Sequence, residues 1–365
     1  MNKMSKGRVL VAMSGGIDSS ITALLLHEQG YEVIGITLKT WEYSSTCSTG
    51  KESGCCNIDS FNDARELAVS MGIPYYIIDI KEQFEEKIIK NFISEYIAGR
   101  TPNPCVICNT EIKWDYFLKK ADQLGCEFIA TGHYAQVNKD DVNGRYFLSK
   151  GIDEKKDQSY VLWGLSQDNL RRTILPLGKY HKSEIKELAT QRGFDNLAKK
   201  RESYEICFVP NDDYRAFLKT RIPELEKKVD GGNFIDTQGN ILGQHKGYPF
   251  YTIGQRKGLE IALGQPMYVV DIIAETNTVV IGTKEEVFKQ EMYITDINLM
   301  KYNRLPNDFE ALVKIRYKDS GEFAILSQEG NKINVKFANK VSAITPGQSA
   351  VFYEGENVIG GGVIC

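Results

Sequence analysis

Residues 11–20, VAMSGGIDSS, place two glycines and three serines directly after a short apolar run. A strand that turns into a helix through such a stretch forms an anion site, because backbone N–H groups converge there and the positive end of the helix dipole faces the ligand. Gly15 and Gly16 permit the tight turn, and the serines add hydroxyl donors. The simpler alternative is a turn that only caps its helix with Ser and Asp.

Strand and helix patterns alternate through the first 200 residues. The expected strands are 8–13, 31–38, 74–80 and 128–131. The expected helices are 19–30, 61–72, 81–100, 112–125, 158–165 and 182–194. This alternation predicts an α/β fold with a doubly wound parallel sheet, and ligands of such sheets bind at the carboxyl ends of the strands.

The pattern changes after about residue 210. A helix expected at 212–222 precedes a Gly-rich, aromatic segment at 231–259, and short alternating runs such as EALVKIRYK at 310–318 follow. Such runs, separated by Gly, Asn and Pro turns, predict a small antiparallel barrel or sandwich. We therefore expect three domains: an α/β domain at 1–210, a small central α+β domain at 211–284 and a C-terminal β-barrel at 285–365.

The composition is that of a soluble globular protein, with 365 residues of which 42% are hydrophobic and 25% charged. No apolar run is long enough to span a bilayer and no signal-peptide core is present, so we expect a cytoplasmic protein without membrane contact. The net charge is −3. Residues 150–201 carry 12 Lys and Arg against 7 Asp and Glu, and such a basic stretch can bind phosphates within an acidic protein.

Two cysteine segments offer nucleophiles. GRTPNPCVICNTEIKW (99–114) predicts Cys105 and Cys108 on a Pro-stiffened loop between two helices, and RESYEICFVP (201–210) contains Cys207. A helix start directly after Cys108 would lower the pKa of its thiol. A C-x-x-C pair is also typical of a redox dithiol or half of a zinc site.

The other cysteines are expected to be structural. Cys126 and Cys365 are interpreted as small buried hydrophobic residues. Residues 46–59, TCSTGKESGCCNID, could hold zinc through Cys47, Cys55 and Cys56. Their spacing is irregular and no His lies nearby, so a loop that closes on the substrate is favoured, and no metal site is expected.

The full SGGxDSS string directly after a strand resembles the pyrophosphatase loop of ATP-dependent adenylating enzymes. The loop lacks the Lys of a Walker A motif, which argues against a P-loop. Five motifs then follow one another: SGGxDSS at 14–20, TPNPCxxCN at 101–109, ATGHYA at 130–135, KKDQSY at 155–160 and ESYEICF at 202–208. In this order they resemble the bacterial tRNA-specific 2-thiouridylases, the MnmA family. GYPFYTIGQRKGL at 247–259 and IRYK at 315–318 extend the resemblance over essentially the whole chain.

The resemblance implies an N-terminal ATP pyrophosphatase domain and a two-step reaction. With Mg²⁺, ATP would adenylate the carbonyl oxygen at carbon 2 of the wobble uridine in the tRNA anticodon loop, with loss of pyrophosphate. Cys207 would carry a persulfide supplied by a donor protein such as a cysteine desulfurase or a sulfur-relay carrier. Attack by Cys108 would release the sulfur and leave a Cys108–Cys207 disulfide while AMP departs.

The resemblance also implies binding residues. Those expected to contact ATP are Ala12, Met13, Ser14, Gly15, Gly16, Ile17, Asp18, Ser19, Leu38 and Gly132. Those expected to contact tRNA are Asn103, Pro104, Cys105, Lys156, Asp157, Gln158, Arg316 and Tyr317. The central domain at 211–284 is expected to contact tRNA as well. Residues 199–201, Lys-Lys-Arg, are as consistent with phosphate contacts as with a solvated face.

One residue departs from the family pattern, and other functions stay open. Several members carry Asp where this chain has Cys105, so an acid or base role at that position is in doubt. Cys105, Cys108 and Cys207 could instead hold an iron–sulfur cluster, as in related RNA thiolases. An ATP-pyrophosphatase amidotransferase would leave the cysteine motifs unexplained, and a non-enzymatic RNA-binding module would leave the ATP loop without a use.

Overall fold

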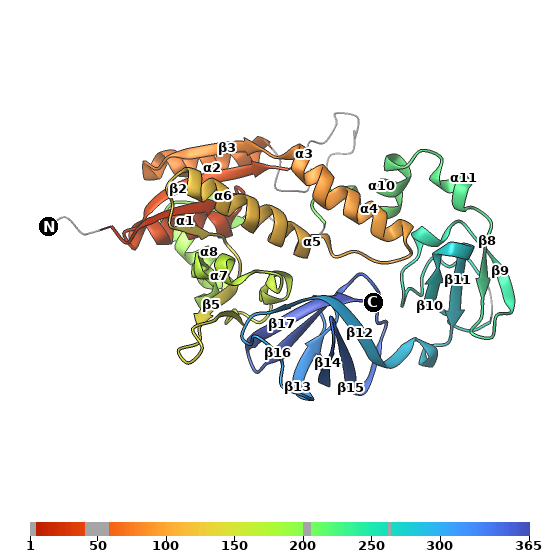
Figure 1. The fold of residues 1–365 in the computed structure, drawn as a ribbon. Helices are drawn as coiled ribbons and strands as arrows, with labels where there is room; N and C mark the ends of the chain where they lie inside the picture. Colours follow the sequence, from red (N-terminus) through yellow and green to blue (C-terminus); the bar gives the residue numbers. More distant parts are fainter. Residues whose placement is uncertain (1–4, 41–57, 200–205, 262–263) are drawn as a thin grey trace. The chain divides into compact units, whose positions relative to one another are not determined.

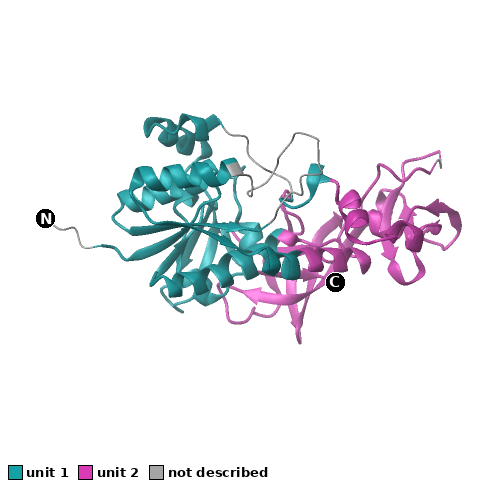
Figure 2. Ribbon diagram, turned by 90° about the horizontal axis from the view of Figure 1, so that it is seen from above, with its two compact units in different colours: residues 1–88, 105–212, 356–359 teal, residues 89–104, 213–355, 360–365 magenta. Residues whose placement is uncertain are grey.

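The computed structural model describes residues 5–40, 58–199, 206–261 and 264–365 (Figure 1). The chain divides into two compact units, coloured separately in Figure 2. Unit 1 comprises residues 1–88, 105–212 and 356–359, and unit 2 comprises residues 89–104, 213–355 and 360–365. None of the described helices is both long and apolar enough to cross a membrane. The division into three domains stays a prediction.

Unit 1 contains the parallel sheet. Its strand order is β3-β2-β1-β4-β7, with β1 at the centre. The bounds are Arg8–Ala12 for β1, Glu32–Lys39 for β2, Tyr75–Asp79 for β3, Phe128–Ala130 for β4 and Thr173–Ile174 for β7. Val9, Leu10 and Val11 of β1 are fully buried, as in a strand covered on both faces. The doubly wound parallel sheet predicted from the sequence is confirmed.

Helix α1 (Ile17–Glu28) packs into two clusters of the core of unit 1. Its Leu26 lies with β1 residues and with helix α2 (Ile58–Met71), and its Ile21 lies with helix α8 (Lys182–Gln191). Truncating such a buried aliphatic side chain to Ala typically costs about 2–5 kcal/mol. Because α1 is held on two sides, the loop that precedes it is held in place as well.

The segment with the C-x-x-C motif is helical, so the expected loop at Cys105 and Cys108 is wrong. Helix α5 (Pro104–Ile107) runs directly into a π-helical stretch (Cys108–Tyr116) and then into α6 (Phe117–Gln123). Proline suits the first position of a helix, because its φ is already helical and its missing N–H would have no partner there. Cys108 thus lies one turn inside the helix, and the helix start expected directly after it is wrong.

The other expected helices of the first 200 residues differ in detail. The stretch expected at 81–100 consists of α3 (Lys81–Phe84), a π-helical stretch (Glu85–Ile89) and α4 (Lys90–Ile97). The stretch expected at 158–165 contains only a short 3₁₀ helix, Ser159–Leu162. The unit also contains two short helices, α7 (Gln167–Arg171) and α9 (Asp195–Lys199), and the hairpin of β5 (Ala135–Lys139) and β6 (Tyr146–Lys150).

A closed antiparallel barrel belongs to unit 2, except for residues 357–359 of its last strand, which are counted with unit 1. Its strands follow the order β12-β15-β14-β13-β16-β17, and pairing of β12 with β17 closes it. The bounds are Phe288–Leu299, Phe309–Lys314, Glu322–Glu329, Lys332–Ser342, Ser349–Glu354 and Asn357–Ile364 for β12 to β17. In the first half of β15 every second residue points inward, with Ile333, Val335 and Phe337 almost fully buried. Of the barrel and sandwich predicted, the barrel is confirmed.

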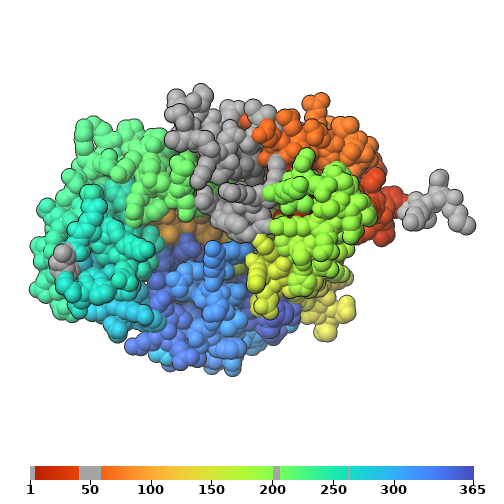
Figure 3. All heavy atoms as spheres, turned by 180° about the vertical axis from the view of Figure 1, so that it is seen from behind, coloured from red at the N-terminus to blue at the C-terminus, as the bar shows by residue number. Residues whose placement is uncertain are grey.

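A second, four-stranded sheet of unit 2 has the order β10-β11-β8-β9. Its strands are β8 (Gly232–Ile235), β9 (Ile241–His245), β10 (Tyr268–Ile273) and β11 (Thr278–Gly282). Helices α10 (Tyr214–Arg221) and α11 (Leu225–Val229) precede it. Figure 3 shows the side chains of these segments in a space-filling view.

Candidate active site

The loop between β1 and α1 has a conformation that only glycine tolerates. Gly15 has φ +72°, and a Cβ on it would lie 2.0 Å from the carbonyl oxygen of Ser60 in α2. Gly16 precedes the first residue of α1 with φ −91° and ψ 160°, and no side chain caps the helix there. The first N–H groups of α1 are therefore not occupied by a cap, as an anion site at a helix start requires.

The serines of the loop hydrogen-bond within it. Ser19 Oγ donates to the carbonyl oxygen of Gly16 at 3.0 Å and accepts from the backbone N–H of Ser14 at 3.0 Å. The hydroxyls of Ser14 and Ser19 lie 3.2 Å apart. Ser20 Oγ is buried and has no hydrogen-bond partner among the described residues. The hydroxyl of Ser19 thus shapes the turn, and the ligand donors that the geometry offers are chiefly backbone N–H groups.

Asp18 at the start of α1 is held by two side chains that the sequence did not identify. Lys182 Nζ lies 2.7 Å from Oδ1 and 2.8 Å from Oδ2 of Asp18, and Tyr134 Oη donates to Oδ1 at 2.7 Å. The side chain of Lys182 is only 8% exposed, whereas that of Asp18 is 32% exposed. Tyr134 belongs to the ATGHYA motif, but nothing in the sequence distinguishes Lys182 from its neighbours.

Gly132 of the same motif packs against the start of α1. A Cβ at this position would lie 2.8 Å from the carbonyl carbon of Asp18 and 2.9 Å from the backbone nitrogen of Ser19. The structure thus brings Gly132 against the glycine-rich loop, as an adenosine contact there would require. The adjacent His133 shares a hydrogen bond of 2.7 Å with Thr131. Burial, and then the charge of Lys113, hold the pKa of the His133 imidazole well below its usual value.

The remaining residues expected at the nucleotide lie at the carboxyl ends of β1 and β2. Ala12 pairs with Ile36 in the parallel register. Met13 is buried and donates its backbone N–H to the carbonyl oxygen of Ile36 at 2.8 Å. Leu38 is half-buried near the end of β2. These residues share one sheet edge with the loop, which is where ligands of doubly wound sheets bind.

The motif cysteines differ in exposure. Cys108 is half-buried and Cys207 is exposed. Asn109, directly after Cys108, is buried and donates from Nδ2 to the carbonyl oxygen of Val161 at 2.9 Å, so this turn of helix is anchored. Phe208 is buried and meets Phe84 edge to face at 5.6 Å between ring centroids, which anchors the chain beside Cys207.

The exposure of Cys126 and Cys365 tests the prediction that both are small buried hydrophobic residues. Cys126 is buried, and burial raises the pKa of its thiol to about 11, which confirms an inert core residue. Cys365 is exposed, so its interpretation as a buried hydrophobic residue is wrong. Cys47, Cys55 and Cys56 lie outside the described residues. Within the described ranges, no three Cys, His, Asp or Glu side chains form a group that could hold a metal ion.

Two of the residues expected to contact tRNA have structural contacts in unit 1. Asp157 Oδ1 accepts from the backbone N–H groups of Gly151 and Ser159, at 3.2 and 3.1 Å. Gln158 Oε1 accepts from the backbone N–H of Tyr134 at 3.0 Å. Their side chains therefore shape the segment that presents the half-buried Lys156.

The other residues expected to contact tRNA lie in two segments. Cys105 is exposed on α5, where Pro104 is buried and Asn103 half-buried. Arg316 and Tyr317 are exposed in the turn between β13 and β14, not on a strand. Of residues 199–201, only Lys199 is described, and it is exposed.

Known proteins match this chain over its whole length. Three family models match consecutive parts of the chain. They are a tRNA methyl transferase HUP domain at residues 7–211, a tRNA methyl transferase PRC-barrel domain at 215–283 and an aminomethyltransferase beta-barrel domain at 289–364. The tRNA-specific 2-thiouridylase MnmA of Amoebophilus asiaticus is 58% identical over 362 residues, which cover 99% of this chain and 96% of the relative. That of Cytophaga hutchinsonii is 56% identical over 360 residues, covering 98% and 97%.

Proposed function

Because this chain belongs to the family of tRNA-specific 2-thiouridylases, we propose that it replaces the oxygen at carbon 2 of the wobble uridine of tRNA with sulfur, at the expense of ATP. The enzyme class is a tRNA sulfurtransferase. The observation that carries the proposal is the glycine-only turn at Gly15, combined with Cys108 and Cys207 in the same unit. The cytoplasm, where tRNA is modified and thiols stay reduced, is the proposed location.

The first half of the reaction needs a site for triphosphate. The uracil oxygen attacks the α-phosphorus of ATP, a P–O bond forms, and pyrophosphate leaves. The uncapped N-terminus of α1 and the close approach at Gly15 suit a pyrophosphate group bound by backbone N–H groups. Gly132, Met13 and Leu38 would face the adenosine, and Mg²⁺ would shield the phosphates. Lys182 would hold Asp18 beside this site.

The second half transfers sulfur. A donor protein loads a persulfide onto Cys207, whose exposure suits delivery from outside. The Cys108 thiolate then attacks Sγ of Cys207, so the persulfide S–S bond breaks and hydrosulfide is released as the Cys108–Cys207 disulfide forms. Hydrosulfide attacks carbon 2 of the adenylated uracil and AMP leaves. A thiol reductant restores both cysteines for the next turnover.

The uridine must leave its stack before either step. A base in an anticodon loop is splayed out readily, and enzymes that modify a base atom extrude the nucleotide into a pocket. Asn103 and Pro104 are proposed to face the target base with Cys105. Lys156, Asp157, Gln158, Arg316 and Tyr317 are proposed to contact tRNA.

The test is a reaction of purified protein with unthiolated tRNA, ATP, Mg²⁺ and a persulfide donor. Nucleoside mass spectrometry should show 2-thiouridine at the wobble position, and chromatography should show AMP in equal amount. Because two family models are described as tRNA methyl transferase domains, S-adenosylmethionine is supplied in a parallel reaction. A methylated uridine there, without thiolation, would contradict the proposed reaction, and ADP as the main nucleotide product would contradict the adenylation step.

The iron–sulfur alternative is tested in the same assay. Protein freed of iron by chelation should thiolate tRNA as fast as the untreated protein, because the persulfide route needs only Cys108 and Cys207. If only iron-reconstituted protein is active, the cysteines are cluster ligands and the persulfide roles are wrong.

A further inference from the structure

Cys105 and Cys108 lie on one turn of a continuous helix. Cys105 belongs to α5, and Cys108 is the first residue of the π-helical stretch that continues it. Ile107 has φ −61° and ψ −43°, so the backbone is helical across this junction. Residues three apart in a helix are neighbours, with Cα atoms about 5 Å apart. Because a disulfide needs Cα atoms about 4.4–6.8 Å apart, the backbone spacing suits a bond between the two sulfurs.

Another side of the same helix is held by packing. Val106 and Asn109, which are also three residues apart, are both buried. Asn109 Nδ2 is bonded to the carbonyl oxygen of Val161 at 2.9 Å. Cys105 is exposed and Cys108 is half-buried. The buried pair thus fixes the helix, while the two cysteines lie on a side that reactants can reach.

The proposed reaction leaves a disulfide that must be resolved. After each sulfur transfer Cys207 is bonded to Cys108, so it cannot accept another persulfide. Cys105 adds a third thiol three positions before Cys108, and all three cysteines belong to unit 1. A group tethered this closely has an effective concentration of at least about a millimolar towards its neighbour. Cys105 is therefore well placed to attack a disulfide at Cys108.

Resting on the proposed function, which forms the Cys108–Cys207 disulfide, we propose that Cys105 is the resolving thiol of the cycle. The Cys105 thiolate attacks Sγ of Cys108, the bond to Cys207 breaks, and a Cys105–Cys108 disulfide forms. Cys207 leaves as a thiolate and takes up the proton that Cys105 lost. One disulfide replaces another, so the exchange itself needs neither an oxidant nor a reductant.

This step gives Cys105 a role that an aspartate cannot have. Cys207 regains its thiol and can accept the next persulfide, and the thiol reductant of the proposed cycle then reduces the Cys105–Cys108 disulfide. Family members with Asp at this position have no sulfur there, so they need the reductant to act on the first disulfide directly. The step belongs to chains that carry Cys at this position.

The experiment maps disulfides after one turnover. Full-length protein is loaded with persulfide, separated from donor and reductant without oxygen, and given ATP, Mg²⁺ and unthiolated tRNA. Thiols are then alkylated and the protein is digested with trypsin. Cys105 and Cys108 fall in the peptide 101–113, and Cys207 falls in the peptide 202–215. Mass spectrometry therefore distinguishes a disulfide within the first peptide from a crosslink between the two.

In the wild type we expect the disulfide within 101–113 in an amount equal to the 2-thiouridine formed, with Cys207 alkylated. Cys105→Ser should instead contain the crosslink, again compared per 2-thiouridine formed, so that a change in tRNA contact does not enter. A second exposure to the donor should load the wild type but not Cys105→Ser until reductant is added. Cys365→Ser, which removes another exposed thiol, is the matched control and should behave as the wild type. Circular dichroism checks that each variant is folded.

The outcomes separate the inference from the function beneath it. If the wild type thiolates tRNA but contains only the crosslink, the inference is wrong and the function stands. If Cys105→Ser regains the Cys207 thiol without reductant as readily as the wild type, another thiol resolves the disulfide and the inference is likewise wrong. If the wild type forms no 2-thiouridine, the proposed function fails and the inference fails with it.

Discussion

Lys182 Nζ contacts both carboxylate oxygens of Asp18, at 2.7 and 2.8 Å, although the two residues lie 164 positions apart in the chain. Asp18 is in the first turn of α1, where a carboxylate is favoured by the helix dipole, and Lys182 is the first residue of α8. The pair therefore joins α1, the helix that follows the glycine-rich loop, to α8 of the same unit. It sits where a charged nucleotide is expected to bind.

Lys182→Met should lower the free energy of unfolding by about 2 kcal/mol. Breaking a fully buried pair costs about 3–5 kcal/mol, and the smaller value applies because Asp18 keeps a third of its side chain in solvent. Urea unfolding of Lys182→Met, Asp18→Asn and the double variant would measure the coupling free energy between Lys182 and Asp18. The control is the Glu28–Arg192 pair at 2.8 Å, which also bridges 164 positions but is exposed, so Arg192→Met should cost at most about 1 kcal/mol. Equal losses of unfolding free energy in Lys182→Met and Arg192→Met would contradict the expectation that the buried pair contributes more than the exposed one.

Gly15→Ala should abolish ATP binding. The substitution strains a residue at φ +72° and drives its Cβ to 2.0 Å from the Ser60 carbonyl oxygen, so the loop must move. Gly144→Ala separates the backbone strain from the steric clash, because Gly144 also has φ +72° but has open space around it. That variant should cost only about 1 kcal/mol of stability and keep ATP affinity. Calorimetric titration with ATP compares them, and retained affinity in Gly15→Ala would place the nucleotide elsewhere.

Cys207→Ser should not acquire a persulfide, because its sulfur is the proposed acceptor. Cys108→Ser should acquire the extra sulfur on Cys207 but fail to thiolate tRNA, because no thiolate remains to release it. Mass spectrometry of the intact proteins after incubation with the donor measures loading, and nucleoside analysis measures transfer. Cys365→Ser, which removes another exposed thiol, should behave as the wild type. Loading of Cys207→Ser at the wild-type level would exclude Cys207 as the carrier.

The unfolding free energy should fall below about pH 6.5 through His133. The folded protein holds the pKa of this imidazole well below its usual value, mainly by burial. Between the folded and unfolded pKa values, the unfolded chain binds a proton that the folded protein does not, so stability is complete above the unfolded pKa and is lost as the pH falls.

His133→Asn removes the titratable imidazole and so isolates its contribution to the pH dependence of stability. The difference in unfolding free energy between wild type and variant should be constant above about pH 7 and shift in favour of the variant by up to about 1.4 kcal/mol per pH unit below about 6.5. Chemical denaturation of both proteins from pH 7.5 to 5 measures it. Parallel curves throughout this range would show that His133 is protonated equally in both states.

The sequence predicted the elements whose signals are local. Alternation of apolar runs with 3.6-residue periodicity identified the parallel sheet, and period-two runs identified the barrel. The turn at Gly15 could be predicted because two glycines directly after an apolar strand favour a tight turn into the next helix. Local reasoning fails at Pro104, because a proline that could stiffen a loop can equally start a helix. For that reason the prediction that Cys108 lies on a loop is wrong.

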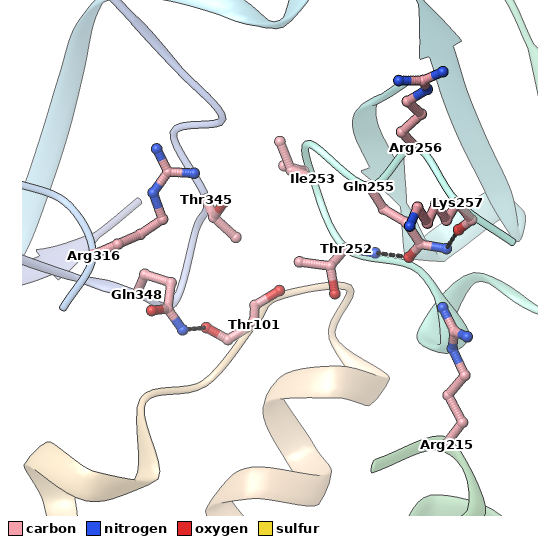
Figure 4. A pocket seen from close by; sticks show the side chains of 10 residues that line it. All are labelled: Thr101, Arg215, Thr252, Ile253, Gln255, Arg256, Lys257, Arg316, Thr345 and Gln348. Atoms are coloured by element: carbon pink, nitrogen blue, oxygen red, sulfur yellow. Dashed lines mark hydrogen bonds between the residues drawn. The ribbon is translucent and has the colours of Figure 1, made fainter. Parts of the chain in front are cut away.

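Only the tertiary structure decided which distant side chains meet. The pairing of Lys182 with Asp18 depends on α8 packing against α1 through Ile185 and Ile21, and no spacing along the chain encodes it. The cavity of unit 2 lined by Arg215, Arg256 and Arg316 likewise depends on three segments that are remote in sequence (Figure 4). A repeating pattern is determined by neighbours a few residues away, whereas a charge pair or a pocket forms only when packing brings separate segments together.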